Sequence, residues 1–186
     1  METLEAIRKR CSLKTHVSGR AISAQTLDII FDAARLAGSA RNFQPWRFIV
    51  VQDRGVLESL TPALSEANQV AVQAAALIVA CARPADDVMH DGKEYYMFDV
   101  GMAVANMLLA ATDLGLVTHL MAAFDEAKIK QILHIPEDVR VVIVTPLAYP
   151  LESSYDEAAA ERLSKRTRKD LSELVYAERW SEPEPA

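Results

Sequence analysis

The 186-residue sequence predicts one layered domain of the α/β or α+β class, in which helices enclose a sheet. The run from Ala76 to Ala82 is continuously apolar, which is typical of a strand covered on both faces. The segment from Tyr95 to Leu114 is apolar nearly all round, so we expect a long helix that is buried on most sides. Gly101 and Ala105, four residues apart, would let another backbone approach closely, either in the core or at a dimer contact. Apolar residues at helical spacing, such as Leu27, Ile30 and Phe31, recur on either side of the strand-like runs.

The remaining elements follow from the same periodicities and from turn residues. Ser23 is a plausible cap for the second helix, and Gly115 is a natural stop for the long one. In chain order we expect a helix over Glu2–Lys9, a helix over Ala24–Ala37, a strand over Trp46–Gln52, helical material over 54–73, a short polar loop over Arg83–Glu94, an apolar run over Leu116–Ala123, a helix over Asp125–Leu133, a strand over Val139–Leu147, and polar sequence with helical pieces over 148–180.

Composition supports a globular domain that needs no disulfide bonds or metal ions for its stability. Hydrophobic residues make up 51% of the chain and charged residues 25%, which is ordinary globular usage. A chain of this size buries roughly 70% of its unfolded surface. We expect one domain over residues 1–180 and a frayed tail over 181–186, which holds two prolines, two glutamates and no large apolar residue.

Cysteine content and hydropathy indicate the cellular compartment of the protein and whether it spans a membrane. The chain has two cysteines, Cys11 and Cys81, and no hydrophobic leader precedes the predicted fold. Both features favour a reducing compartment, so we expect a cytoplasmic protein. The longest apolar stretch, around Met102–Ala111, is shorter than the roughly 20 residues that a membrane helix needs, and we expect no membrane span.

The distribution of charge is more informative than its sum. The net charge of −6 argues against nucleic acid as a partner, although a basic-patch nucleic-acid binder remains an alternative. Half of the 20 Lys and Arg residues lie in two short segments, residues 1–20 and 162–169. Such runs are usually solvated faces, but two basic segments on an acidic chain could also converge on one anion such as a phosphate.

The common catalytic signatures are absent from the sequence. There is no GxGxxG after a strand, no GxxxxGK[ST], no CxxC, no HExxH and no GxSxG. The four histidines have no ligand-like spacing, so no metal site is expected. Hydrolase and metalloenzyme functions are therefore disfavoured.

Two segments could bind a ligand. In an extended backbone Arg10, Ser12 and Lys14 point to one side, where they match a phosphate, a polyol and an electron-rich ring edge. Cys11 then points to the other side, and we expect a packed, inert thiol there. The alternative is a helix end with solvated basic residues. The second segment, Gly38–Trp46, is either an ordinary loop before a strand or a loop that offers Ser and Asn side chains to a ligand.

In order along the chain, these segments resemble the nitroreductase family of FMN-dependent oxidoreductases. That family has R-x-S-x-[RK] followed by P-S-x-x-N-x-Q-P-W. The resemblance covers nearly the whole chain, and the matching residues are Arg10, Ser12, Lys14, Ser39, Asn42, Gln44, Pro45, Trp46, Asp99, Val100, Gly101, Asn106, Leu114, Gly115, Leu116, Phe124, Ile135 and Pro136, with a basic segment before Trp180.

The resemblance implies a three-layer fold with a central mixed, mostly antiparallel sheet enclosed by helices. It also implies an intertwined homodimer in which residues of about 150–180 wrap the partner, with FMN at the interface. The implied cofactor-binding residues are Arg10, Cys11, Ser12, Lys14, Asn68, Ala122, Ala123, Arg166 and Arg168, together with Ser39, Ala40 and Asn42, which the partner would present.

The activity implied by the resemblance is a ping-pong transfer of hydride from NAD(P)H to a nitroaromatic, a quinone or an activated alkene. No side-chain acid or base is expected to be essential. The sequence departs from the family at Gly38, where proline is frequent, and at Ala122–Ala123, where many members have a Glu-Gly pair. Because of the second departure, a non-catalytic flavin or nucleotide carrier or sensor stays open as an alternative.

Overall fold

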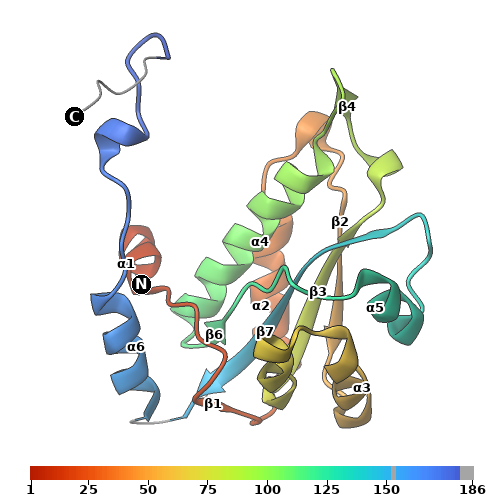
Figure 1. Cartoon of the computed structure of the whole chain (residues 1–186), viewed down its shortest axis with the longest axis vertical. Coiled ribbons are helices and arrows are strands. Elements are labelled where there is room, and N and C mark those ends of the chain that lie inside the picture. The colour runs from red at the N-terminus through yellow and green to blue at the C-terminus, as the bar shows by residue number, and fades with distance from the viewer. Residues whose placement is uncertain (152–153, 181–186) are drawn as a thin grey trace.

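The computed structural model describes residues 1–151 and 154–180 of the chain (Figure 1). Its centre is a five-stranded sheet in the order β1-β7-β3-β2, with β6 also paired to β7. The named strands pair antiparallel, and Ser12 adds a parallel bridge to Thr118, so the predicted mostly antiparallel sheet is confirmed. The strands of this sheet are β1 (Val17–Ser18), β2 (Trp46–Val51), β3 (Ala76–Ala82), β6 (Val117–Thr118) and β7 (Arg140–Pro150).

Helices cover both faces of the sheet, which gives the predicted three layers (Figure 1). The two longest, α2 and α4, pack on one face, and α3 and α5 lie on the other. The α-helices are α1 (Thr3–Lys9), α2 (Ala24–Arg35), α3 (Arg54–Ser59), α4 (Tyr96–Asp113), α5 (Glu126–Leu133) and α6 (Ser154–Ser164).

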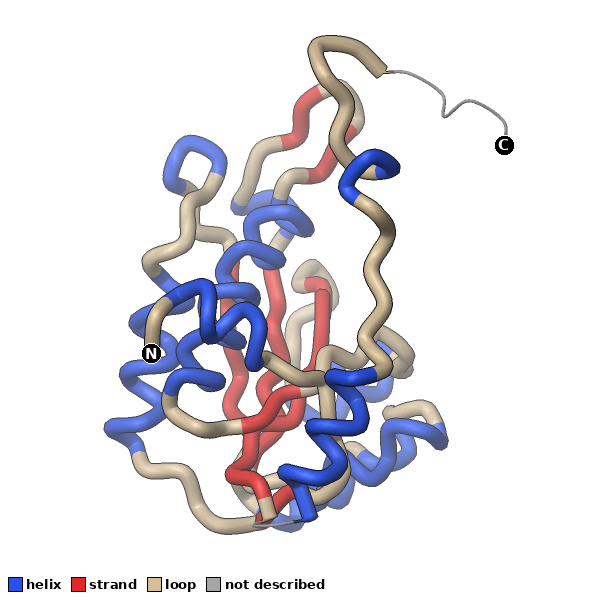
Figure 2. The backbone as a smooth tube through the Cα atoms, turned by 90° about the vertical axis from the view of Figure 1, so that its left-hand side faces the viewer, coloured by secondary structure: helices blue, strands red, loops and turns tan. Residues whose placement is uncertain are grey.

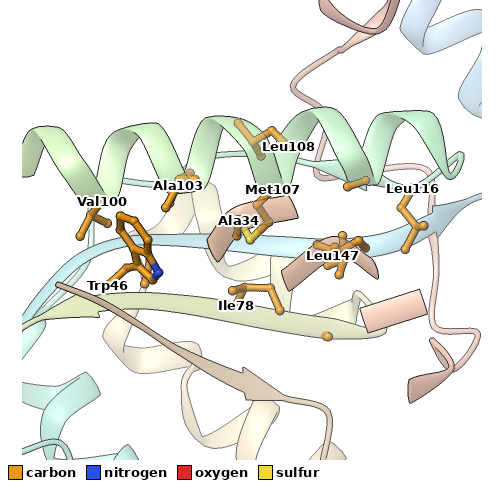
Figure 3. Close-up of a cluster of buried hydrophobic side chains, with 14 of the residues drawn as sticks. Ala34, Trp46, Ile78, Val100, Ala103, Met107, Leu108, Leu116 and Leu147 are labelled. Carbon is orange, nitrogen blue, oxygen red and sulfur yellow. The ribbon is translucent and has the colours of Figure 1, made fainter. Parts of the chain in front are cut away.

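Strand β3 shows why its sequence is continuously apolar. All seven of its residues are buried. Ile78 and its even-numbered neighbours join the core beneath α2 and α4, while Leu77 and Val79 join the core beneath α3 and α5. Figure 3 shows Ile78 and Leu147 of the sheet below Met107 of α4. Successive side chains point to opposite faces, so a strand between two helical layers needs apolar residues at every position.

Local signals set several helix boundaries as predicted. The Ser23 hydroxyl accepts a hydrogen bond from the Thr26 amide, and Asp125 accepts one from the Lys128 amide. Gly115, at φ 76°, follows α4 in the left-handed conformation that glycine adopts without strain. The expected helical stretch 54–73 divides into α3 and two 3-10 segments, Thr61–Ala63 and Glu66–Gln73.

Helix α4 is less enclosed than predicted. Val100, Ala103 and Met107 face the core (Figure 3), but the opposite side of the helix is open within the single chain. Met97 and Phe98 are 51% and 64% exposed. Gly101 and Ala105 are exposed too, and a Cβ added at Gly101 would meet no atom within 4 Å. The expectation of burial on most sides is wrong for the isolated chain, because no element of its described residues covers this outer face.

Short strands were not anticipated from the sequence. The expected loop Arg83–Glu94 contains a hairpin of β4 (Met89–His90) and β5 (Lys93–Glu94), which turns at Asp91 and Gly92 with positive φ at both. The apolar run Leu116–Ala123 forms only β6 and an isolated bridge from Met121 to Val144. These pieces are too short to show a periodicity.

The C-terminal part runs along one side of the molecule and away from it. After α6 the chain has one 3-10 segment, Leu171–Glu173, and rises beyond the body (Figures 1 and 2). Leu171, Leu174 and Val175 in this arm are 72%, 56% and 67% exposed. The expected tail 181–186 lies outside the described residues. Within those residues, no helix is both long enough and apolar enough to cross a bilayer.

Candidate functional site

A basic pocket forms where the two ends of the chain meet. The segment that follows α1 lies beside the last turn of α6 and the residues after it. The pocket has a volume of about 340 Å³ and is lined by Arg10, Cys11, Ser12, Arg162, Lys165, Arg166, Thr167 and Arg168. The two basic segments of the sequence therefore converge, as one of the two interpretations predicted.

Hydrogen bonds hold this arrangement together. Arg166 donates to the backbone carbonyl of Arg8 at 3.0 Å and also to that of Arg10. Arg10 in turn donates from Nη1 to the Ser12 hydroxyl at 2.9 Å. Arg10 and Ser12 thus point to the same side of an extended segment, as predicted for these two residues. Arg166 joins the C-terminal segment to the strip formed by the side chains of Arg10 and Ser12.

The electrostatics of the pocket favour an anion. Within residues 1–151 and 154–180, Arg10, Arg162, Arg166 and Arg168 form no ion pair with a carboxylate, whereas Lys165 pairs with Glu161 at 2.5 Å. Four guanidinium groups without a counter-ion raise the local potential, although the whole chain carries −6. Arginine side chains with free donors bind phosphate or carboxylate through strong, charge-assisted hydrogen bonds.

Hydrogen bonds also link three other predicted cofactor-binding residues, Lys14, Asn68 and Ala123, next to the Arg10–Ser12 strip. Lys14 Nζ donates to Asn68 Oδ1 at 2.5 Å, and Asn68 Nδ2 donates to the Ala123 carbonyl at 3.5 Å. Asn68 is 7% exposed, and the Ser65 amide also donates to Ala123. Lys14, Asn68 and Ala123 are therefore held together although 109 residues separate the first from the last. Neighbouring Ala122 lies instead on an apolar pocket beside α4.

His119 lies close to the same strip and was not anticipated from the sequence. Its neighbour Thr118 pairs with Ser12, and the Nδ1 atom of His119 is buried without a hydrogen-bond partner among the described residues. Burial lowers the pKa of His119, a hydrogen bond with the Ser12 backbone raises it, and the charges of Lys14 and Arg162 lower it further. The lowered pKa favours the neutral form of an imidazole that has the positive charges of Lys14 and Arg162 near it.

Ser39, Ala40 and Asn42 lie at the other end of the molecule. The Ala40 amide donates to Asp99 near the start of α4, whereas Cys11 and Thr112 share a pocket near its end. Thirteen residues of helix separate Asp99 from Thr112, which corresponds to about 20 Å at 1.5 Å per residue. One chain therefore does not bring this loop to its own basic pocket.

The backbone of that loop is unusual. Arg41, Asn42 and Gln44 have φ values of 49°, 60° and 51°, in the left-handed region that residues other than glycine seldom adopt. The Ser39 hydroxyl accepts from the Gln44 amide at 3.0 Å, and the Gln44 side chain donates to Asn42. These bonds fix an exposed loop in one conformation, as expected of a loop that presents groups to a ligand or a partner.

The family model of the nitroreductase family matches residues 7–149, which is more than half of the chain. The chain belongs to the nitroreductase family. A putative NADH dehydrogenase/NAD(P)H nitroreductase of Archaeoglobus fulgidus is 32% identical over 183 residues, covering 96% of this chain and 99% of the relative. A second relative of the same description, from Methanothermobacter thermautotrophicus, is 34% identical over 82% of this chain and 80% of its own length.

Solved nitroreductase structures share the fold. A nitroreductase family protein of Clostridium difficile superposes with a TM-score of 0.81 at 28% identity, covering 97% of this chain and all of the other. One from Clostridium novyi gives 0.77 at 36% identity over 87% and 92% of the two chains. A structure described as an oxidoreductase containing FMN gives 0.78 at 26% identity over 95% and 91%.

Two features of the basic pocket differ from the sequence prediction. Arg162 and Lys165 of the second basic segment line the pocket but are not among the predicted cofactor-binding residues, and their helical spacing with Arg166 is the signal that could have assigned them. Cys11 is buried, at 7% exposure, as expected of a packed thiol. It nevertheless lines both the basic pocket and an adjoining apolar one, instead of pointing wholly away from the strip.

Proposed function

We propose that this protein is an FMN-dependent oxidoreductase that takes hydride from NAD(P)H and reduces a small organic acceptor, such as a nitroaromatic, a quinone or an activated alkene. The observation that carries the proposal is the basic pocket, in which both ends of a nitroreductase-family chain place arginines around one cavity and no carboxylate of the described residues pairs with them. FMN is named in the description of a similar solved structure.

The residues present fit the phosphate end of FMN. A phosphate monoester carries about −1.5 to −2 charges at neutral pH, which the arginines of the pocket can balance. Ser12, held by Arg10, adds a hydroxyl toward the ribityl chain. Arg10, Ser12, Arg166 and Arg168 are the proposed phosphate ligands, and Cys11 lines the same pocket.

Lys14, Asn68, Ala122 and Ala123 are assigned to the flavin ring. When bound, FMN supplies the redox chemistry, passing hydride between nicotinamide and acceptor in a ping-pong order. Lys14, positioned by Asn68, would place a positive charge where negative charge develops on the pyrimidine edge. No side chain of the proposed site is needed as a proton donor, because solvent can reach an open pocket.

The proposed active unit is a homodimer. The outer face of α4 is apolar and open, and a pocket of about 360 Å³ continues it toward Leu120 and Ala122. A second copy on this face would bury the exposed Met97 and Phe98. It would also bring its own Ser39, Ala40 and Asn42 toward the cofactor, which the single chain does not. The exposed apolar residues of the arm within 150–180 are proposed to wrap the partner.

A cytoplasmic location completes the proposal. It is supported by Cys11 and Cys81, which are both free and buried, as is usual where disulfides do not persist.

Stopped-flow mixing tests the enzymatic assignment. The flavin-loaded protein is mixed with NADH or NADPH without oxygen, and flavin absorbance is followed. Rapid bleaching, followed by recovery on addition of a quinone or nitroaromatic, is the expected result. A flavin that stays oxidised for minutes with either nicotinamide would instead indicate a carrier or sensor, the alternative suggested by Ala122–Ala123.

A further inference from the structure

Helix α6 carries part of the basic pocket but packs weakly on the rest of the chain. Arg162 lies on α6, and the chain adds three further basic residues to the pocket directly after the helix. None of the residues of α6, Ser154–Ser164, all of which the structure describes, is buried. Figure 1 shows the helix at one side of the molecule, apart from the helices that cover the sheet. Burial of apolar side chains, which normally stabilises a helix in a protein, is therefore small for α6.

A hollow lies between the middle of α6 and the body of the protein. It has a volume of about 350 Å³, and α6 lines it with Tyr155, Asp156, Ala159, Ala160 and Leu163. The end of α4 and residues 115–117 also line it. Cys11 lines both the hollow and the basic pocket, so the two cavities adjoin each other. Because protein interiors are close-packed, a hollow of this size means that the middle of α6 lacks packing partners.

Two attachments hold α6 near its ends. Before the helix, the Leu151 amide donates to the His16 carbonyl at 2.8 Å. In the first turn, Tyr155 packs against buried residues of β6 and β7. After the helix, Arg166 donates to the backbone carbonyl of Arg10. The helix therefore spans the hollow between these attachments.

Like charges oppose the docking of α6 when the basic pocket holds no anion. Arg10 and Arg162 line the same pocket from the two ends of the chain, and neither pairs with a carboxylate of the described residues. Lys165 pairs with Glu161 of α6 itself, so this ion pair does not attach the helix to the body. Positive charges that folding brings together repel one another, whereas an anion between them attracts both sides.

We propose that α6 is a strap whose docking on the body is controlled by the anion in the basic pocket. With the pocket empty, charge repulsion acts against weak packing, and α6 detaches in a fraction of the molecules. A detached helix of 11 residues is marginal in water, so it also frays. A phosphate group in the pocket accepts hydrogen bonds from both sides and holds the helix down. The consequence for FMN rests on the proposed function, whereas the response to an inorganic anion does not.

Hydrogen exchange of the cofactor-free full-length protein tests the strap, with inorganic phosphate as the anion and a constant, low ionic strength. Without phosphate, the amides of α6 are expected to exchange much faster than those of β3. Phosphate at ten times its Kd is expected to slow the exchange of α6 about tenfold. The Tyr95 amide, which donates to Val88 at the other end of α4, is the internal reference and should not respond. Exchange of α6 that is as slow as that of β3 without phosphate, or that phosphate does not change, would overturn the proposal.

Filling the hollow should dock α6 without an anion. Ala159→Leu adds apolar volume inside the hollow and is expected to slow α6 exchange about tenfold in the absence of phosphate. It should also lower the Kd for phosphate, because less of the binding free energy is spent on docking the helix. Ala127→Leu, the same change at an exposed position of α5, is the matched control and should alter neither reading.

Removing one repelling charge gives a second test that does not depend on how leucine fits the hollow. Arg162→Gln is expected to slow α6 exchange severalfold without phosphate and to raise the Kd for phosphate. A purely structural Arg162 would give the opposite change in exchange, and that result would overturn the proposal. Arg35→Gln on α2 should change neither quantity. If phosphate docks α6 but FMN does not bind, the proposed function is wrong and the strap stands.

Discussion

Arg166 donates from Nη1 to the backbone carbonyl of Arg8 at 3.0 Å, although 158 positions separate the two residues in the chain. This contact joins the C-terminal segment to the strip that carries Arg10 and Ser12. It also explains how a chain with a net charge of −6 builds a strongly positive pocket. The pocket is positive because folding brings arginines from both ends of the chain together.

Removing two of these guanidinium groups should release the cofactor. Charge-assisted hydrogen bonds contribute about 1.5–3 kcal/mol each, so Arg10→Ala with Arg168→Ala should raise the Kd for FMN by roughly ten- to hundredfold per residue. Titration of the cofactor-free protein with FMN, followed by flavin fluorescence, measures this. Arg35→Ala on α2, where Arg35 pairs with Asp32 at 2.5 Å, is the control and should leave the Kd unchanged. A double variant that keeps its full flavin content would refute the phosphate assignment.

A charge on the outer face of α4 should prevent dimerisation. A Cβ at Gly101 meets no atom within 4 Å, so Gly101→Glu should not disturb the fold of the chain. In the proposed dimer the new carboxylate would be buried without a partner, at a cost of several kcal/mol. Sedimentation velocity should show monomers for Gly101→Glu. Gln131→Glu, which adds the same charge at an exposed position of α5, should stay dimeric. An unchanged dimer in both variants would place the interface elsewhere.

The two thiols should be unreactive in the native protein. Cys11 is 7% and Cys81 2% exposed, and burial raises the pKa of Cys81 to about 12. Ellman's reagent should therefore react slowly with the folded protein and release two equivalents in denaturant. Immediate reaction of one thiol in the wild type but not in Cys11→Ser would show that the pocket wall is open to electrophiles.

The contribution of Glu126 should depend on pH. Arg140 donates to its carboxylate at 2.9 and 3.0 Å and the Val141 amide at 2.9 Å, and the bond from Arg140 is the largest cause of its lowered pKa. With a lowered folded pKa, this stabilisation is present above the unfolded pKa and is lost as the pH falls through the folded pKa.

Urea denaturation of Glu126→Gln measures that contribution. The Glu126 side chain is 25% exposed, so solvent weakens the pair and we expect a loss of about 1 kcal/mol at pH 7. The difference from the wild type should shrink as the carboxylate is protonated in acid. Equal differences at pH 7 and in acid would show that the charge of Glu126 is not involved.

The parts of the fold with strong periodicity were predictable from the sequence. Strand β3 was placed residue by residue, because all its side chains are buried. Helices α2 and α5 were placed within two residues of their bounds, and Ser23 was predicted as the cap of α2. The hairpin of β4 and β5 was not predicted, because two-residue exposed strands carry no apolar alternation.

The site was predictable in its charged residues and not in its geometry. The strip Arg10–Ser12–Lys14 and the second basic segment follow from spacing and charge. The burial of His119 and the hydrogen bond from the Ala40 amide to Asp99 do not, because they depend on which elements pack together. The open face of α4 shows the same limit, since apolar residues look alike in sequence whether they meet the core or a second copy.

The absorption spectrum of the purified protein, before and after denaturation, tests the central claim most directly. We expect the bands of oxidised flavin, with one FMN per chain released on unfolding. A colourless protein that also fails to bind added FMN would contradict the assignment of the basic pocket and the function built on it.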